Sequence, residues 1–165
     1  MNSVGERIDR AVRLYKKTEA MVHAHPLLVQ LLVELDGKIS ASRQSMNRLG
    51  VVFICRTCEE EEGGSCCGAG IEKRYSTELL FINLMLGVRL HRQVSRPESC
   101  HFLSSGGCLL RARHVLCVNY LCPRLRQALG HERLLGLQET TGRELDCLFR
   151  FHETLKKVLE PERWK

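Results

Sequence analysis

The segment Cys55-Arg-Thr-Cys58 begins a stretch, ending at Cys122, that holds eight of the nine cysteines in the chain. These eight residues form two groups, Cys55, Cys58, Cys66 and Cys67, then Cys100, Cys108, Cys117 and Cys122. Two thiolates separated by two residues can bind one soft metal ion from a single turn, and a second group supplies further ligands. The spacing therefore predicts a loop-rich metal-binding region over residues 50–125, with all eight cysteines as ligands.

The cysteine content and the compartment together limit the chemistry. A chain of 165 residues has the size of one domain and can bury an adequate apolar core without crosslinks. Residues 1–10 are charged and lack the apolar core of a secretory signal, so we expect a cytoplasmic protein. Disulfides are rare in a reducing cytosol, and an odd number of cysteines fits disulfide pairing poorly. Metal binding or redox chemistry remains.

The formal net charge of +6 suggests nucleic acid as a partner, but this count treats every thiol as neutral. Eight ionised thiols around two Zn²⁺ ions would lower it by four, to +2, so part of the basic excess can balance thiolates. Few aromatic residues lie among the arginines, which disfavours a stacking platform for single strands. The most apolar run, Leu27–Leu35, is far shorter than the ~20 residues of a spanning helix, so no membrane segment is expected.

Apolar residues at helical spacing predict helices before the cysteine region. Residues 6–23 form an amphipathic pattern, and Pro26 suits the first turn of a second helix. The second helix carries a seam with alternating spacings of four and three residues, namely Leu28, Leu32, Leu35, Ile39, Ser42, Met46 and Leu49. The seam fits either a coiled-coil dimer or a helical hairpin folded on its own core, and the short repeat favours a hairpin over residues 1–49.

The residues around the first cysteine group predict a buried segment, a loop and a central helix. Val51-Val52-Phe53-Ile54 is expected to be a short buried segment that holds Cys55 rigidly. Glu59–Glu62 is expected to be a solvated loop, with carboxylate ligation of a harder iron site as the alternative. A buried helix should run from Ser76 or Thr77 to about Arg92, with Asn83 hydrogen-bonded to a neighbouring backbone.

After the turn-rich second cysteine group, residues 126–165 are expected to form C-terminal helices. Pro123 should begin a short helix that Gly130 stops, and Cys122 would lie at its start. The capping-box spacing of Thr141-Gly-Arg-Glu144 predicts a last helix closed by Pro161, with Cys147 as a small core residue. His101 and His114 are expected to form hydrogen bonds or lie at the surface, with metal ligation as the alternative. The whole chain, residues 1–165, is therefore predicted to be a single, mainly α domain of about five helices.

The order of the cysteines resembles the YkgJ-type cysteine-cluster family. The resemblance covers about residues 50–125 and rests on the CxxC of Cys55 and Cys58, the adjacent Cys66 and Cys67, and then Cys100-His-Phe-Leu103, Gly107-Cys108, Arg113 with Cys117, and Cys122. It implies a domain that chelates zinc or iron through eight cysteines. Two features depart from the family pattern: seven residues, in place of two, separate Cys58 from Cys66, and His114 stands where the family has proline.

Three classes of function follow. The first is a metal-binding protein that holds zinc or an iron–sulfur cluster; since side chains of adjacent residues diverge, Cys66 and Cys67 favour two ions or a polynuclear cluster. The second is a redox or methyl-transfer enzyme, implied by similar cysteine clusters in flagellin lysine methylases; a thioredoxin-like dithiol is disfavoured by the glutamates after Cys58. The third is an interaction module for nucleic acid or protein, with candidate residues Arg111, Arg113, Arg124, Arg126 and Arg133.

Overall fold

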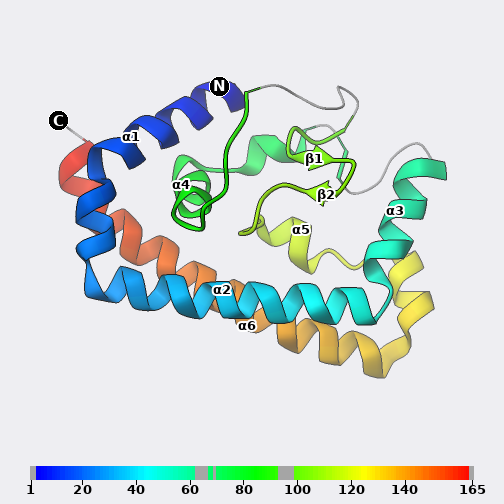
Figure 1. The fold of residues 1–165 in the computed structure, drawn as a ribbon. Coiled ribbons are helices and arrows are strands. Elements are labelled where there is room, and N and C mark those ends of the chain that lie inside the picture. Colours follow the sequence, from blue (N-terminus) through cyan, green and yellow to red (C-terminus); the bar gives the residue numbers. More distant parts are fainter. Residues whose placement is uncertain (1–2, 62–66, 69, 93–98, 164–165) are drawn as a thin grey trace.

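The structure is a computed structural model, and it describes residues 3–61, 67–68, 70–92 and 99–163 (Figure 1). The described residues form six α-helices, a 3₁₀ helix and one short antiparallel hairpin: α1 Val4–Ala24, α2 Pro26–Arg48, α3 Val51–Glu61, η1 Ile71–Arg74, α4 Thr77–Met85, β1 Leu103–Ser104, β2 Gly107–Cys108, α5 Val115–Asn119 and α6 Pro123–Arg163. The expectation of a small, mainly α fold is confirmed.

The first two helices begin at capping residues that match their sequences. At α1, the Ser3 side chain accepts the Glu6 amide and the Glu6 carboxylate accepts the Ser3 amide, so two end amides are satisfied at once. At α2, His25 Nδ1 accepts the Leu28 amide at 3.4 Å and Pro26 occupies the first turn. The helix junction predicted at Pro26 is therefore confirmed.

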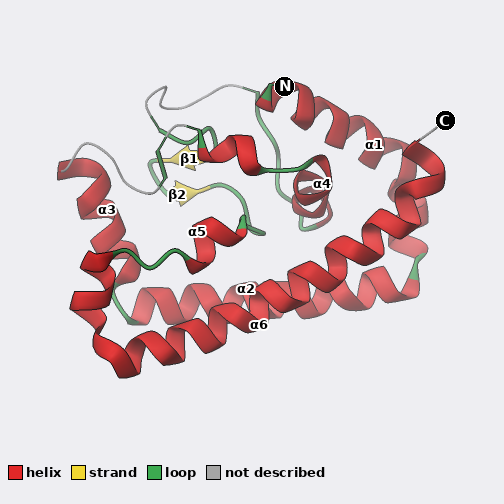
Figure 2. Ribbon diagram, turned by 180° about the vertical axis from the view of Figure 1, so that it is seen from behind, coloured by secondary structure: helices red, strands yellow, loops and turns green. Residues whose placement is uncertain are grey.

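The long helices α2 and α6 pack side by side in opposite directions along one side of the molecule, whereas α1 crosses over to pack against α4 (Figure 1, Figure 2). The predicted seam of α2 faces this packing, since Leu28, Leu35, Ile39 and Met46 are buried. The principal partner of α2 is α6, which is more than 70 residues away in the sequence, and α2 contacts α1 less extensively.

Apolar side chains gather into two clusters. The main cluster joins α1, α2, α4, the hairpin region and the later part of α6, and it includes Leu35, Leu80, Phe81, Leu110 and Phe151. The second cluster lies where α2, α3, α5 and the beginning of α6 meet, and it comprises Met46, Val51, Val118, Leu121, Leu125, Leu129 and Leu137. No helix within the described ranges has both the length and the apolar character needed to cross a membrane.

The prediction of a short buried segment before Cys55 is wrong, because the run forms the first turn of helix α3. Val51 is buried, but Val52 and Phe53 are 46% and 74% exposed. The β-branched residues favoured an extended, buried segment over a helix. In a helix, however, successive side chains point in different directions, so only part of an apolar run faces the core. The glutamates expected in a loop continue α3 as far as Glu61, and Glu62 lies outside the described residues.

Helix α4 is buried and begins after Ser76 as predicted, but it ends at Met85 and not near Arg92. Gly87 adopts a φ of 79°, which takes the chain out of the helix through the left-handed region. Asn83 is bonded as expected: its side-chain nitrogen donates to the carbonyls of Leu79 and Ala112, both at 2.9 Å. Its oxygen accepts the amides of Arg111 at 2.9 Å and Ala112 at 3.1 Å, which fixes the loop before α5.

The C-terminal region is one long helix with a kink. Helix α6 begins at Pro123 as predicted, and Gly130 interrupts it with φ 72° and ψ 171° before the helix resumes. The predicted capping box is wrong, because Thr141 lies inside the helix and its hydroxyl donates to the Leu137 carbonyl. Pro161 does not close the helix, which continues to Arg163. Cys147 is buried in α6, as expected.

Candidate functional site

The two cysteine groups meet through the backbone at Cys67 and Cys100. The Cys100 amide donates to the Cys67 carbonyl at 2.7 Å, and the neighbouring residues Gly68 and Ser99 form an antiparallel bridge. Helix α4 lies between these segments in the sequence, so the chain turns back on itself to bring them together. This junction places part of the first group beside the second.

The hairpin β1–β2 adds Cys108 to the same region. Cys108 pairs with Leu103 across the hairpin, and the turn uses Gly107 at φ 103°, a conformation that side chains disfavour. Burial raises the pKa of Cys108, although the guanidinium of Arg113 acts in the opposite direction. Burial, with a smaller contribution from Cys108, raises the pKa of Cys100 to about 12. Both thiols are therefore protonated at neutral pH in the absence of a metal.

Tyr75, which follows η1, connects this region to α5. Its side chain is 1% exposed, and its hydroxyl donates to Cys117 Sγ at 3.6 Å and accepts the His114 amide at 3.0 Å. The Tyr75 ring packs edge-on against Phe102 of the second cysteine group, with the ring centroids 5.1 Å apart. Burial, with the thiols of Cys117 and Cys108 nearby, raises the pKa of Tyr75, so its hydroxyl stays neutral and can donate to sulfur.

Arginines approach the thiols from α2 and the loop before α5. Arg43 donates to the Leu110 carbonyl at 2.6 Å, and burial followed by repulsion from Arg113 lowers its pKa. Glu144 of α6 is fully buried near both arginines, and neither of its carboxylate oxygens has a hydrogen-bond partner among the described residues. Positive charge here would offset part of the charge of ionised thiols.

The remaining described cysteines lie toward the second hydrophobic cluster. The Leu125 amide donates to Cys122 Sγ at 3.5 Å, so this thiol caps the start of α6 as the sequence predicted. Cys55 and Cys58 belong to α3, whose Ile54 packs on the same cluster as Cys122. Helix α3 is connected to the Cys67–Cys100 junction by a hydrogen bond of 2.6 Å from the Ser99 hydroxyl to Glu59.

The structure therefore packs Cys67, Cys100, Cys108 and Cys117 on the main cluster and Cys122 on the second cluster. Cys55 and Cys58 lie on α3, which contacts the second cluster through Ile54 and the Cys67–Cys100 junction through Glu59. Cys66, the eighth predicted ligand, lies outside the described residues. Within the part of the chain that the structure describes, no three or more His, Cys, Asp or Glu side chains are placed to hold a metal ion.

The two candidate histidines have the hydrogen-bonding roles that the sequence favoured. His101 Nε2 bonds to the His91 carbonyl at 2.8 Å, and His114 Nδ1 accepts the Leu116 amide at 3.2 Å. Sequence reasoning missed Tyr75 and Arg43, because a single tyrosine after η1 and an arginine on a helix carry no spacing signal. Comparison with known proteins found no matching family model, no matching curated protein and no matching solved structure.

Proposed function

We propose that this chain binds zinc or an iron–sulfur cluster through the thiolates of its clustered cysteines. The observation that carries the proposal is the Cys67–Cys100 junction, which brings together cysteines from two groups that α4 separates in the sequence. Cys108 and Cys117 join them from the hairpin and α5. The ordered set of eight cysteines, which resembles the YkgJ-type pattern, supports the same proposal.

The chemistry of the donor set fits a soft metal, because thiolates bind zinc and iron–sulfur clusters in preference to oxygen ligands. Cys67, Cys100, Cys108 and Cys117 would hold the metal, and Cys66 follows from its position next to Cys67. The described thiols are not placed as a coordination shell, so binding requires a local rearrangement around the junction. It also requires each thiol to lose its proton, which Arg113 and Arg43 favour at Cys108. Bound zinc would supply a structural crosslink, whereas a bound cluster would supply electron transfer.

Metal analysis of protein purified without oxygen tests this proposal. Zinc in stoichiometric amount with no visible absorption would establish the zinc form, and iron with equal sulfide and a visible band would establish the cluster form. Protein that holds neither, and that takes up neither Zn²⁺ nor a reconstituted cluster, would refute the proposal.

The interaction-module alternative gains no support from the arginines that suggested it. Arg111 forms an ion pair with Asp36 of α2, and Arg113 contacts Met46 Sδ at 3.4 Å. Arg126 donates to the Leu121 carbonyl at 2.9 Å. Arg111, Arg113 and Arg126 therefore each have a partner within the chain. The alternative of a redox or methyl-transfer enzyme depends on the cluster form of the proposed site.

A further inference from the structure

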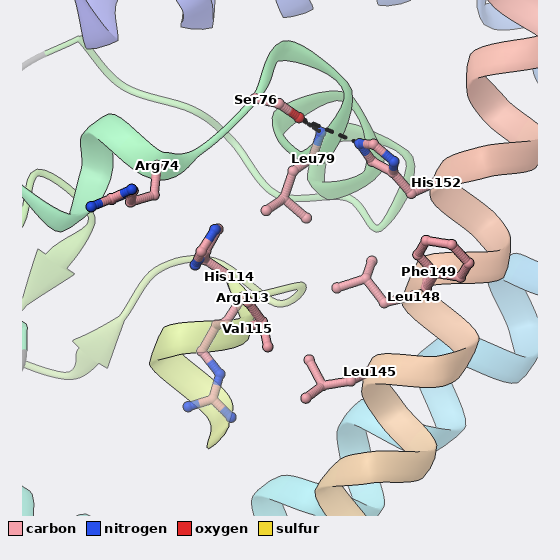
Figure 3. A pocket seen from close by; sticks show the side chains of 10 residues that line it. All are labelled: Arg74, Ser76, Leu79, Arg113, His114, Val115, Leu145, Leu148, Phe149 and His152. Carbon is pink, nitrogen blue, oxygen red and sulfur yellow. Dashed lines mark hydrogen bonds between the residues drawn. The ribbon is translucent and has the colours of Figure 1, made fainter. Parts of the chain in front are cut away.

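A cavity of about 390 Å³ lies between η1, α4, the start of α5 and α6 (Figure 3). Small-molecule sites in proteins have volumes of roughly 300–1,000 Å³, so this cavity can take a small organic ligand. None of the predicted cysteine ligands among the described residues lines it. A role for this cavity therefore does not depend on the metal proposed above.

The walls of the cavity are mostly apolar. Leu79 of α4 faces Leu145 and Leu148 of α6 across it (Figure 3). Phe149 and Val115 also line the cavity, yet they are 65% and 46% exposed, so apolar surface continues to its open side. Apolar side chains that line a cavity and remain exposed to water gain free energy when a hydrocarbon covers them.

Polar groups of defined orientation lie at the start of α4 and at the start of α5. The Ser76 hydroxyl accepts the Leu79 amide at 3.1 Å and lies 3.5 Å from His152 Nε2 (Figure 3). Because His114 Nδ1 accepts the Leu116 amide, the proton of its neutral ring is held on Nε2. His114 thus offers a hydrogen-bond donor.

The charged side chains that line the cavity have one sign. Arg74 and Arg113 are lining residues together with the two histidines, and the described lining contains no aspartate or glutamate. A ligand that complements this lining carries a negative charge at one end and hydrocarbon at the other.

We propose that the cavity binds a medium-chain aliphatic carboxylate, with its carboxylate near Ser76, His114 and Arg74 and its chain along Leu79, Leu145 and Leu148. The leucines contribute affinity through burial of methylene groups, and the basic residues select an anionic head. The His114 amide donates to the Tyr75 hydroxyl, which in turn donates to Cys117 Sγ, so Tyr75 would connect the head of the ligand to the thiol region.

Isothermal titration calorimetry with hexanoate, octanoate and decanoate tests the proposal, with the metal-free and the metal-loaded protein measured separately. We expect affinity to rise about fourfold for each methylene that enters the cavity. Octylamine should bind at least tenfold more weakly than octanoate. The absence of binding by every carboxylate, or equal binding of octylamine, would overturn the proposal. Because binding is measured in both forms, failure here is distinguishable from failure to bind metal.

Two variants with matched controls locate the site. Leu145→Trp fills the cavity and should weaken octanoate binding at least tenfold, whereas Leu135→Trp, on an exposed position of the same helix, should leave it unchanged. Arg74→Glu should weaken binding at least threefold, whereas Lys73→Glu, which does not line the cavity, should have little effect. Equal effects of a variant and its control would show that octanoate binds elsewhere. Circular dichroism checks that each variant is folded. Arg74 is exposed, so Arg74→Glu should fold and still tests the site if Leu145→Trp does not fold.

Discussion

The hydroxyl of Tyr75 donates a hydrogen bond to the sulfur of Cys117, 42 positions further along the chain. The same oxygen accepts the amide of His114, so one buried side chain satisfies two groups of the segment that leads into α5. A phenylalanine ring would fill the same space but form neither bond.

Tyr75→Phe should therefore lower the free energy of unfolding by about 1–3 kcal/mol, because the partly buried His114 amide loses its partner. Urea unfolding of the metal-free protein measures this loss. Tyr120→Phe is the control, since Tyr120 is largely exposed. Equal stability of the two variants would mean that the Tyr75 hydroxyl does not stabilise the region.

Asn83 provides a second test of how the thiol region is held. Asn83→Ala removes four hydrogen bonds, two of them to amides of the loop between Cys108 and Cys117, and should cost about 3 kcal/mol or more. Asn47→Ala, at an exposed position of α2, should change stability by less than about 0.5 kcal/mol. Thermal unfolding of both variants checks this difference.

Cysteine substitutions test the ligand assignment. Cys66→Ser and Cys117→Ser should lower metal stoichiometry and also reduce thermal stability, because a metal that connects the two groups closes a long loop of chain. Cys147→Ala should keep its full metal content, since Cys147 is buried in α6 outside the ordered set. Metal loss from the Cys147 variant as complete as that from the Cys66 variant would contradict the assignment.

Glu144 should make stability depend on pH. Burial raises its pKa above the usual value of 4.5, and Arg113 and Arg43 offset this only in part. Between 4.5 and the raised pKa the folded state holds a proton that the unfolded state has lost, so stability falls as pH rises through this window. Glu144→Gln should remove this fall, whereas Glu139→Gln, at an exposed position, should retain it. Urea midpoints measured from pH 4 to 8 provide the comparison.

Two glycines of α6 should respond to alanine with opposite signs. Gly130 has φ 72° and ψ 171°, a conformation almost confined to glycine, so Gly130→Ala should destabilise the protein by about 1–3 kcal/mol. Gly136 lies within the helix with nothing near its missing Cβ, so Gly136→Ala should stabilise it by about 0.5–1 kcal/mol. Chemical denaturation of both variants distinguishes a glycine that the kink requires from a glycine that the helix merely tolerates.

The sequence predicted those parts of the fold that follow from local rules. Pro26 and Pro123 mark helix starts because proline suits a first turn, and Asn83 was expected to find backbone partners because a buried amide requires them. The errors arose where tertiary contacts decide. Thr141 has the spacing of a cap but lies inside α6, and the packing of α2 along α6 extends the helix past that signal.

The predicted ligand set stays a prediction, and the sequence explains only part of how its thiols come together. Spacing along the chain identifies which thiols could share a site, but the Cys67–Cys100 junction depends on a backbone hydrogen bond between distant segments. The capping role of Cys122 follows from its place before Pro123, so the sequence was sufficient there. Tyr75 is the residue that no spacing indicates, since its role depends entirely on where η1 lies against α5.

The division of the apolar side chains into two clusters has a consequence for local opening. Cys117 packs on the main cluster, whereas Cys122 packs on the second one with α3 and the beginning of α6. Separate clusters can exchange their amide hydrogens with solvent through separate subglobal openings. A metal bound by cysteines from both clusters would couple these openings. Amides of α3 would then exchange only as often as those of α4. Protection of α3 from hydrogen exchange would then report occupancy of the thiol region.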